Sequence, residues 1–309
     1  MRSIVKYNEP LAPYTTWHVG GVADCYYRPV DIEDLIECLQ DIPQNMPITW
    51  LGLGSNVLIS DQGLRGAVIH CLSSSTKTPL LGQELIQLSI FPGSKKLSHE
   101  AEIVRAEAFV PAAKLAKFCA KTGLVGGEFF AGIPGTIGGA LAMNAGAWGS
   151  DTWQHAIGVE VVNRRGERRF RPRETYEVGY RSVTSLEQEE EWFVAGYFQF
   201  EKGDAKAAQD KIKALLQLRN QQQPIGVFSG GSVFMNPYPQ HAGQLIEASN
   251  LKGYSIGGAE VSSIHANFIL NRGKASANDI WQLIKHVQSV VKATHNIDLK
   301  TEVKMLGVF

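Results

Sequence analysis

The chain has 309 residues, of which 44% are hydrophobic and 19% charged, a globular composition long enough for two or three domains. Thirty basic and thirty acidic side chains cancel, so the net charge gives no reason to expect nucleic acid or an anionic membrane as a partner. Residues 1–17 lack the apolar core of a signal peptide, and no stretch is apolar enough to span a bilayer. We therefore expect a cytoplasmic protein without a membrane partner, and we expect it to act as a monomer.

The cysteines and metal-binding motifs are uninformative about catalysis. Cys25, Cys38, Cys71 and Cys119 form no CxxC pair, and their scattered spacing favours buried free thiols. The sequence has no HExxH motif, facial triad or EF-hand loop, so we expect no metal site.

The first part of the chain alternates strand-like and helix-like patterns. We expect a helix from an N-cap at Asp31 to about Gln40. A turn at Gly63 separates two of the expected short strands. The expected strands cover residues 23–28, 48–53, 58–60 and 67–70.

The middle of the chain predicts strands at 85–90 and 102–108, followed by a helix over 111–122 that ends at Gly123. A hairpin around Arg165-Gly166 is expected to join strands at 158–163 and 168–171. Another strand is predicted over 192–200.

The last hundred or so residues predict a compact α+β domain behind a linker helix. The linker helix would cover 204–223 and end at Pro224, with Leu215, Leu216 and Leu218 facing a core. The other expected elements are helices over 243–249 and 277–295 and strands over 268–270 and 299–303.

The stretch GIPGTIGGALAMNAGAWG at 132–149 is uncharged and rich in glycine. Because glycine loses much conformational freedom on folding, so many of them indicate backbone lying directly against a ligand. A phosphate-bearing cofactor is the usual ligand of such a surface. The alternative is a tight turn followed by a glycine-rich loop that binds nothing.

A second glycine loop, LGLGSN at 51–56, follows a predicted strand. It is not a GxGxxG fingerprint and precedes a strand, which disfavours a Rossmann domain. Two separate glycine loops could nevertheless hold one dinucleotide.

Four single residues are further candidates, each with a simpler alternative. Arg181, beside a tyrosine, suits a carboxylate but could be a surface arginine. Ser232, between glycines and an apolar pair, is sterically open but lacks a GxSxG context, and it could be a turn serine. Glu302 could be a buried acid or a solvent-facing residue, and His265 a ligand or a core histidine.

Taken in order, eight segments resemble the UDP-N-acetylenolpyruvoylglucosamine reductases of bacterial cell-wall synthesis, in the shorter, type II branch. They are TTWHVGGVAD (15–24), LGLGSNVLISDQGLRG (51–66), GIPGTIGGALAMNAGAWG (132–149), YR (180–181), GGSVFMNP (230–237), AGQLIEASNLKG (242–253), SSIHANFILN (262–271) and TEVKMLG (301–307).

The resemblance implies an α+β fold with an FAD-binding region of the vanillyl-alcohol-oxidase type over 18–203. That region would consist of two α+β subdomains, at about 1–65 and 66–203. A smaller α+β substrate domain would follow over 204–300, and the C-terminal strand, 301–309, would return to the active site.

The resemblance also implies the chemistry. NADPH would reduce FAD, and the reduced flavin would pass hydride to C3 of the enolpyruvyl group of UDP-N-acetylglucosamine enolpyruvate, giving UDP-N-acetylmuramate. Arg181 and Glu302 match the family residues at the substrate carboxylate, where negative charge develops. Ser232 matches the proton donor to C2.

The remaining site residues are also implied by the resemblance. Tyr180, Asn236 and His265 would bind the substrate. The residues expected at FAD are Gly52, Gly54, Ser55, Asn56, Gly132, Ile133, Pro134, Gly135, Gly138, Gly139, Asn144, Ala145 and Gly146. Met235 and Ile264 stand where basic residues are usual in the family.

Two alternative functions stay open at this point. A flavin oxidoreductase of the same fold could act on another substrate, and a flavoprotein could bind FAD without turnover. The presence of Ser232 argues against the second alternative.

Overall fold

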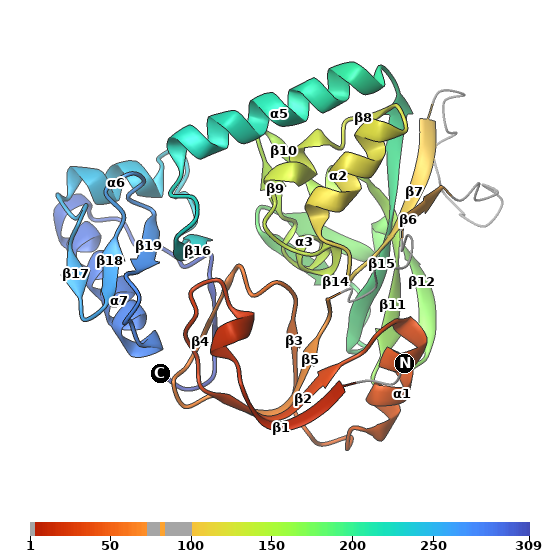
Figure 1. The fold of residues 1–309 in the computed structure, drawn as a ribbon, viewed down its shortest axis with the longest axis horizontal. Coiled ribbons are helices and arrows are strands. Elements are labelled where there is room, and N and C mark those ends of the chain that lie inside the picture. Colours follow the sequence, from red (N-terminus) through yellow and green to blue (C-terminus); the bar gives the residue numbers. More distant parts are fainter. Residues whose placement is uncertain (1–3, 73–80, 84–100) are drawn as a thin grey trace. The chain divides into compact units, whose positions relative to one another are not determined.

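The computed structural model describes residues 4–72, 81–83 and 101–309 (Figure 1). The chain folds into two compact units, each assembled from separate stretches. Unit 1 comprises Met1–Ile4, Tyr27–Met46 and His70–Leu218, and unit 2 comprises Val5–Tyr26, Pro47–Ile69 and Arg219–Phe309. The regions predicted to bind FAD and substrate are 18–203, 204–300 and 301–309. The compact units do not show which residues bind a ligand, so this division stays a prediction. The strand expected over 85–90 lies outside the described residues.

The N-terminal part of unit 2 is a four-stranded sheet beside a separate pair of strands. The order in the sheet is β1 (Ile4–Pro10), β2 (Val22–Arg28), β5 (Leu64–His70) and β3 (Ile48–Leu51). A 3-10 turn, η1 (Ala12–Tyr14), follows β1. Strand β4 (Val57–Ile59) instead pairs in parallel with β20 (Lys304–Leu306), so the last residues of the chain pack beside early ones. Leu11, Tyr26 and Leu51 are buried in the core of this part.

The strand expected over 299–303 is wrong, because β20 begins at Lys304. The preceding residues hydrogen-bond to the segment after β16 instead: Thr301 forms an isolated bridge with Phe234, and Glu302 N donates to Val233 O. Residues 299–303 therefore connect two elements, although their alternating pattern is that of a strand.

The C-terminal part of unit 2 is a second four-stranded sheet with two helices. The sheet order is β16 (Phe228–Ser232), β19 (Phe268–Asn271), β18 (Ala259–Val261) and β17 (Ser255–Ile256), all antiparallel. The helices are α6 (Ala242–Ala248) and α7 (Ala277–His295). Both helices and the strand at 268–270 were predicted, and these predictions are confirmed.

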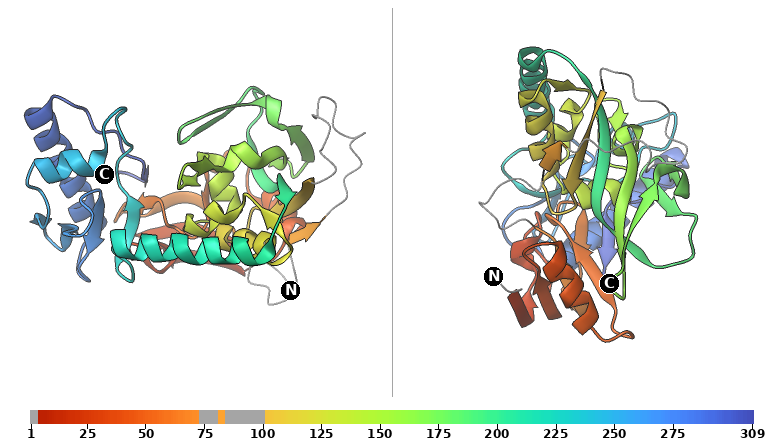
Figure 2. Two further views of the ribbon diagram at one scale, coloured as in Figure 1. Left: turned by 90° about the horizontal axis from the view of Figure 1, so that it is seen from above. Right: turned by 90° about the vertical axis from the view of Figure 1, so that its right-hand side faces the viewer.

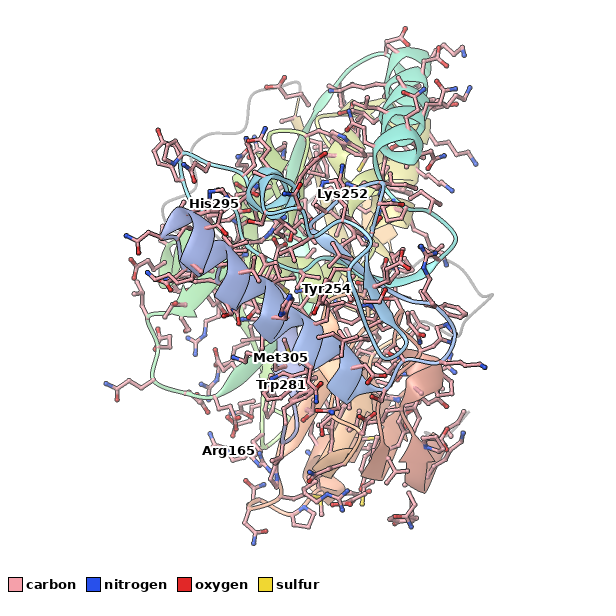
Figure 3. All side chains as sticks on the ribbon, turned by 90° about the vertical axis from the view of Figure 1, so that its left-hand side faces the viewer. Arg165, Lys252, Tyr254, Trp281, His295 and Met305 are labelled. Carbon is pink, nitrogen blue, oxygen red and sulfur yellow. The ribbon has the colours of Figure 1, made fainter. Side chains whose placement is uncertain are left out.

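Helix α7 has the bounds that the sequence predicts, because both of its ends are marked chemically. Ser276 and Asp279 form a capping box at its start, and Asn296 ends it in the left-handed region at φ 56°. The apolar stripe through Ile280 and Val287 is buried. Figure 3 shows Trp281 and His295 toward opposite ends of the helix. Trp281 and Met305 of β20 both pack against the hydrophobic core of this unit.

Unit 1 is built on an antiparallel sheet with the order β12 (Arg168–Pro172), β11 (Ala156–Asn163), β15 (Glu191–Lys202), β7 (Ala101–Glu107) and β6 (Leu81–Gln83). The short β8 (Leu124–Val125) also pairs with β15. The right-hand view of Figure 2 shows the long strands of this sheet side by side. The predicted hairpin is confirmed, since Val162 pairs with Arg168 and Gly166 turns with φ 81°.

Helices α1 (Ile32–Asp41), α2 (Ala112–Lys121), α3 (Ile137–Met143) and α4 (Thr152–His155) also belong to unit 1. The predicted N-cap is confirmed, because the Asp31 side chain accepts from Asp34 N. Helix α2 ends before Gly123, whose φ of 75° favours glycine. Leu115, Leu141 and Phe198 are among the buried side chains by which α2, α3 and the sheet form one core.

The predicted linker helix is α5 (Ala205–Gln222), a single straight helix in Figure 2. Of the residues predicted to face a core, Leu216 packs against it as expected, but Leu218 does not. Ala208 and Ile212 are buried and Leu216 packs beside them, at a spacing of four residues, whereas Leu218 is 41% exposed.

The cysteines are free, as predicted, but Cys25 is only half-buried. It lies on β2, where successive side chains alternate between the two faces of the sheet. Among the described residues, no helix combines the length and hydropathy that crossing a bilayer requires.

Candidate functional site

The glycine loop at 52–56 connects β3 to β4 in unit 2, and it fits tightly against the chain at residues 14–16. Gly54 has φ 63°, and a Cβ built on it would lie 2.1 Å from Tyr14 O. Both the amide and the hydroxyl of Thr16 donate to Gly54 O. Glycine is therefore required here by backbone conformation and by space.

The same loop offers unused hydrogen-bond donors. None of the hydrogen bonds described for residues 4–72 and 101–309 uses the backbone N–H of Gly52, Gly54 or Ser55. Gly54 and Ser55 are successive residues, and successive amides with no acceptor in the described part of the chain are the donor set that a pyrophosphate requires. This part of the site fits FAD.

Asn56, at the end of this loop, links it to the C-terminal segment. Its side-chain NH₂ group donates to Glu302 O at 3.1 Å, and its main-chain carbonyl accepts from Lys304 N at 3.0 Å. Two predicted residues, Asn56 and Glu302, are thereby neighbours although 246 residues separate them.

The long glycine stretch lies in unit 1, and much of its glycine content is explained by packing within the protein. It forms η3 (Glu128–Gly132), α3 and β9 (Gly146–Ala147), which pairs with β10 (Ser150–Asp151). A Cβ at Gly132 would lie 2.4 Å from the Trp148 indole, and one at Gly146 would lie 2.5 Å from Ser150 O. These glycines allow close approach of protein to protein.

Hydrogen-bonding groups at both ends of α3 are engaged by the protein. Gly138 N donates to Ala108 O, and Gly139 N donates to the Thr136 hydroxyl. The side chain of Asn144, also predicted at FAD, donates to Gly179 O and accepts from Trp153 N. What this stretch exposes is a surface of small and flat residues.

That exposed surface includes Pro134, Gly139 and Ala142, while Ile133 is buried and Gly132, Gly135, Ala145 and Gly146 are partly exposed. The Gly135 carbonyl accepts from Ala112 N, and the Ala145 carbonyl from the amide and hydroxyl of Thr152. A flat cofactor can therefore pack on this stretch chiefly through van der Waals contact.

Tyr180 and Arg181 form the tip of a hairpin between β13 (Tyr176–Gly179) and β14 (Ser182–Ser185), next to the 3-10 turn η4 (Arg173–Thr175). Arg181 has φ 54°, which is uncommon for a residue other than glycine. Its guanidinium lies 5.4 Å from the Tyr180 ring centroid and donates to Asn144 O and Gly146 O at 3.4 and 3.3 Å. Arg181 therefore lies beside the glycine stretch, within unit 1.

Ser232 ends β16 in unit 2, opposite Phe268 of β19. The next residue, Val233, accepts the amide of Glu302 at 2.8 Å. The structure therefore brings the backbones of the predicted proton donor and the predicted acid together.

A pocket of about 330 Å³ in unit 2 contains three predicted residues: Ser232, Asn236 and His265. The side-chain oxygen of Asn236 accepts from Ala242 N at the start of α6, so the side-chain NH₂ group of Asn236 is left for a ligand. Nδ1 of His265 accepts from Asn267 N, so the neutral ring carries its proton on Nε2. Burial lowers the pKa of His265, which favours this neutral form.

Sequence reasoning missed three polar residues of the same pocket: His241, Gln244 and Glu247. Gln244 and Glu247 are three residues apart on α6 and so share one face, a spacing that could have identified them. Glu247 pairs with Lys252, which Figure 3 labels, at 2.6 Å. The residues lining the pocket include no lysine or arginine, and Ile264 is one of them.

The predicted residues thus form two sets, each brought together within its own unit. Unit 1 holds Arg181, Tyr180 and the long glycine stretch, while unit 2 holds the loop at 52–56, Glu302 and the pocket with Ser232. An α+β fold with two glycine segments and unused amides defines an FAD-binding oxidoreductase.

Comparisons with known proteins name the family. A family model described as an FAD binding domain matches residues 23–169, and one described as the C-terminal domain of UDP-N-acetylenolpyruvoylglucosamine reductase matches residues 223–306. The chain belongs to the UDP-N-acetylenolpyruvoylglucosamine reductase family.

Similar proteins of this name cover nearly the whole chain. The reductase of Coxiella burnetii (strain Dugway 5J108-111) is 50% identical over 306 residues, which are 97% of this chain and 95% of that protein. The reductase of Thiobacillus denitrificans is 43% identical over 307 residues, covering 99% and 93%. The crystal structure of the Thermus caldophilus reductase matches with a TM-score of 0.78 at 27% identity and covers 99% of this chain and all of that one. These findings confirm the expected family and its α+β, FAD-binding fold.

Proposed function

We propose that this chain is an NADPH-dependent, FAD-containing reductase that converts UDP-N-acetylglucosamine enolpyruvate to UDP-N-acetylmuramate in peptidoglycan precursor synthesis. The activity is inferred from membership of the family. The observation that best supports the assigned site is that Ser232, Asn236 and His265 line the same pocket. Ser232 also directly precedes Val233, which is hydrogen-bonded to Glu302.

When bound, FAD would supply hydride for C3 of the enolpyruvyl group, with NADPH as the source of that hydride. The unused amides at Gly52, Gly54 and Ser55 would hold its pyrophosphate. Pro134, Gly139 and Ala142 would pack against it.

Addition of hydride to C3 places negative charge on C2 and the attached carboxylate. Arg181, whose guanidinium is always charged, would hold that carboxylate and oppose the charge. Glu302 would act on the same group in its protonated form, because a carboxylate would repel the developing anion. Tyr180 stacks on the guanidinium and would keep it in place.

Ser232 would deliver the proton that completes the reduction, from its hydroxyl to C2. A hydroxyl is a weak acid in water, but proton transfer to a much more basic, carbanion-like carbon is favourable. Asn236 and His265 would bind the remainder of the substrate through their NH₂ and Nε2–H donors.

The two half-reactions test this assignment separately. In Ser232→Ala, NADPH should bleach the flavin at the wild-type rate, while reoxidation by the enolpyruvyl substrate should slow by about 10²–10⁴-fold, the range for loss of a positioned acid. Stopped-flow absorbance of the flavin under anaerobic conditions measures both rates.

Ser229→Ala is the matched control, because Ser229 lies on the same strand opposite Leu270 and does not line the pocket. It should reoxidise at the wild-type rate. A wild-type protein whose reduced flavin ignores the substrate would contradict the proposed function, and normal reoxidation in Ser232→Ala would contradict only the role of the serine.

We also propose that the enzyme works in the cytoplasm as a monomer, without nucleic acid or membrane as a partner. NADPH and nucleotide-sugar precursors are cytoplasmic metabolites, and the four free thiols suit a reducing compartment.

A further inference from the structure

Asn267, directly before β19, makes an unusual set of hydrogen bonds for one buried residue. Its side chain, 4% exposed, accepts from Phe234 N at 2.9 Å and donates to Phe234 O at 2.8 Å. Its main-chain carbonyl accepts from Val233 N at 2.9 Å. One asparagine thus holds both residues that follow Ser232.

The opposite side of the same segment is held by the C-terminal stretch. Glu302 N donates to Val233 O at 2.8 Å, and Met235 N donates to Lys300 O at 2.9 Å. The segment 233–235 therefore lies between Asn267 and residues 300–302. A displacement of this segment would have to break hydrogen bonds on one side or the other.

The chain before Ser232 pairs with β19 at Phe228 and Ser229, but the register of this pairing shifts between Ser229 and Ser232. Gly231 has φ 75°, and a Cβ built on it would meet nothing within 4 Å. The position of the Ser232 hydroxyl therefore depends on the pairing of Ser232 with Phe268, the neighbour of Asn267, and on the residues that follow Ser232. The main chain of Asn267 also contacts a second pocket group, because its backbone N–H donates to Nδ1 of His265 at 3.2 Å.

We propose that Asn267 is a positioning residue for the reductase reaction: its side-chain amide fixes the strand segment that carries Ser232, and so aims the hydroxyl at C2 of the substrate. The proposal rests on the proposed function of Ser232. Proton transfer requires the reacting atoms within hydrogen-bond reach, and a shift of about 1 Å can cost about 100-fold in rate.

The test is Asn267→Ala in the full-length, FAD-loaded protein. Bleaching of the flavin by NADPH should stay within twofold of wild type, while reoxidation by the enolpyruvyl substrate should slow by about 100-fold. The solvent deuterium isotope effect on reoxidation should rise, because proton transfer becomes the slow step. Loss of stability alone would not produce that rise.

A second readout, independent of turnover, reports on the two hydrogen bonds between the Asn267 side chain and Phe234, which we call the clamp. Hydrogen–deuterium exchange should accelerate in peptides that cover residues 230–237, because Phe234 N loses its acceptor. Peptides from the sheet of unit 1 should exchange as in wild type.

Ser276→Ala is the matched control, since it removes the cap of α7 in the same unit without touching residues 232–235. It should leave the reoxidation rate and isotope effect unchanged. The proposal is overturned if Asn267→Ala reoxidises within twofold of wild type with an unchanged isotope effect, or if Ser276→Ala slows reoxidation equally. A wild-type flavin that the substrate does not reoxidise would instead refute the proposed function, and the exchange measurement would still test the clamp.

Discussion

Arg181 shows what single-residue reasoning could and could not find. The sequence identified it as a carboxylate-binding candidate from its type and its tyrosine neighbour. It could not predict the left-handed conformation, because Tyr-Arg is not a turn-forming pair such as Asn-Gly. Holding such a residue at φ 54° costs roughly 1–3 kcal/mol, which the surrounding contacts must offset. Strain of this kind at a proposed binding residue is a signal that only the structure supplies.

His155 predicts how the stability of unit 1 depends on pH. Its ring stacks between Phe129 and Phe200, with centroid distances of 5.4 and 5.3 Å, and burial lowers its pKa below the usual 6.5. The unfolded chain therefore takes up the proton first as the pH falls. The contribution of neutral His155 to the free energy of unfolding is complete above about pH 6.5. It is lost as the pH falls from there through the folded-state pKa.

His155→Phe keeps an aromatic ring between the two phenylalanines and removes the titration. Between pH 7.5 and pH 5.5, the free energy of unfolding in urea should change less for the variant than for wild type. Equal differences in the two proteins would show that His155 does not titrate on unfolding.

At the scale of the element, local sequence signals predicted where helices begin and end, but not which distant residues bind their ends. The start of α7 follows from Ser276 and Asp279, which are adjacent in sequence. Its second N-terminal anchor is Asp61, whose two carboxylate oxygens accept from the amides of Ala277 and Asn278 at 2.9 Å. A partner 216 residues away leaves no trace in a local pattern.

Asp61→Ala should destabilise unit 2 by about 1–2 kcal/mol, because two helix-terminal amides lose an acceptor and the helix dipole loses a compensating charge. Urea denaturation measures this change. Asp298→Ala is the control, since its carboxylate pairs with Lys292 at an exposed site and should contribute less than 1 kcal/mol. Equal losses in the two variants would contradict the anchoring role.

At the scale of the whole molecule, each compact unit is assembled from stretches that are far apart in the sequence. Most individual strands and helices could be predicted because periodicity and capping are local. The pairing of β4 with β20, and of Asn56 with Glu302, could not, because it depends on contacts across more than 240 residues. The glycine loop proposed to hold FAD is therefore completed by the last residues of the chain.

Removal of residues 304–309 tests this dependence. The truncated protein loses β20 and the bond from Lys304 N to Asn56 O, so we expect it to purify without flavin colour and to unfold at lower denaturant concentration. Deletion of Phe309 alone leaves β20 intact and should retain FAD. A yellow truncated protein would show that residues 52–56 hold their conformation without the strand.

The pairing of β4 with β20 also sets the order of events during synthesis. Residues 57–59 leave the ribosome early, but their partner strand is among the last to be made. Long-range pairing of this kind is slow to form, and β4 cannot pair with β20 until residues 304–306 have been made. We therefore expect flavin capture through this loop to follow the synthesis of β20, so a nascent chain stalled before residue 304 should remain colourless however much FAD the cell contains.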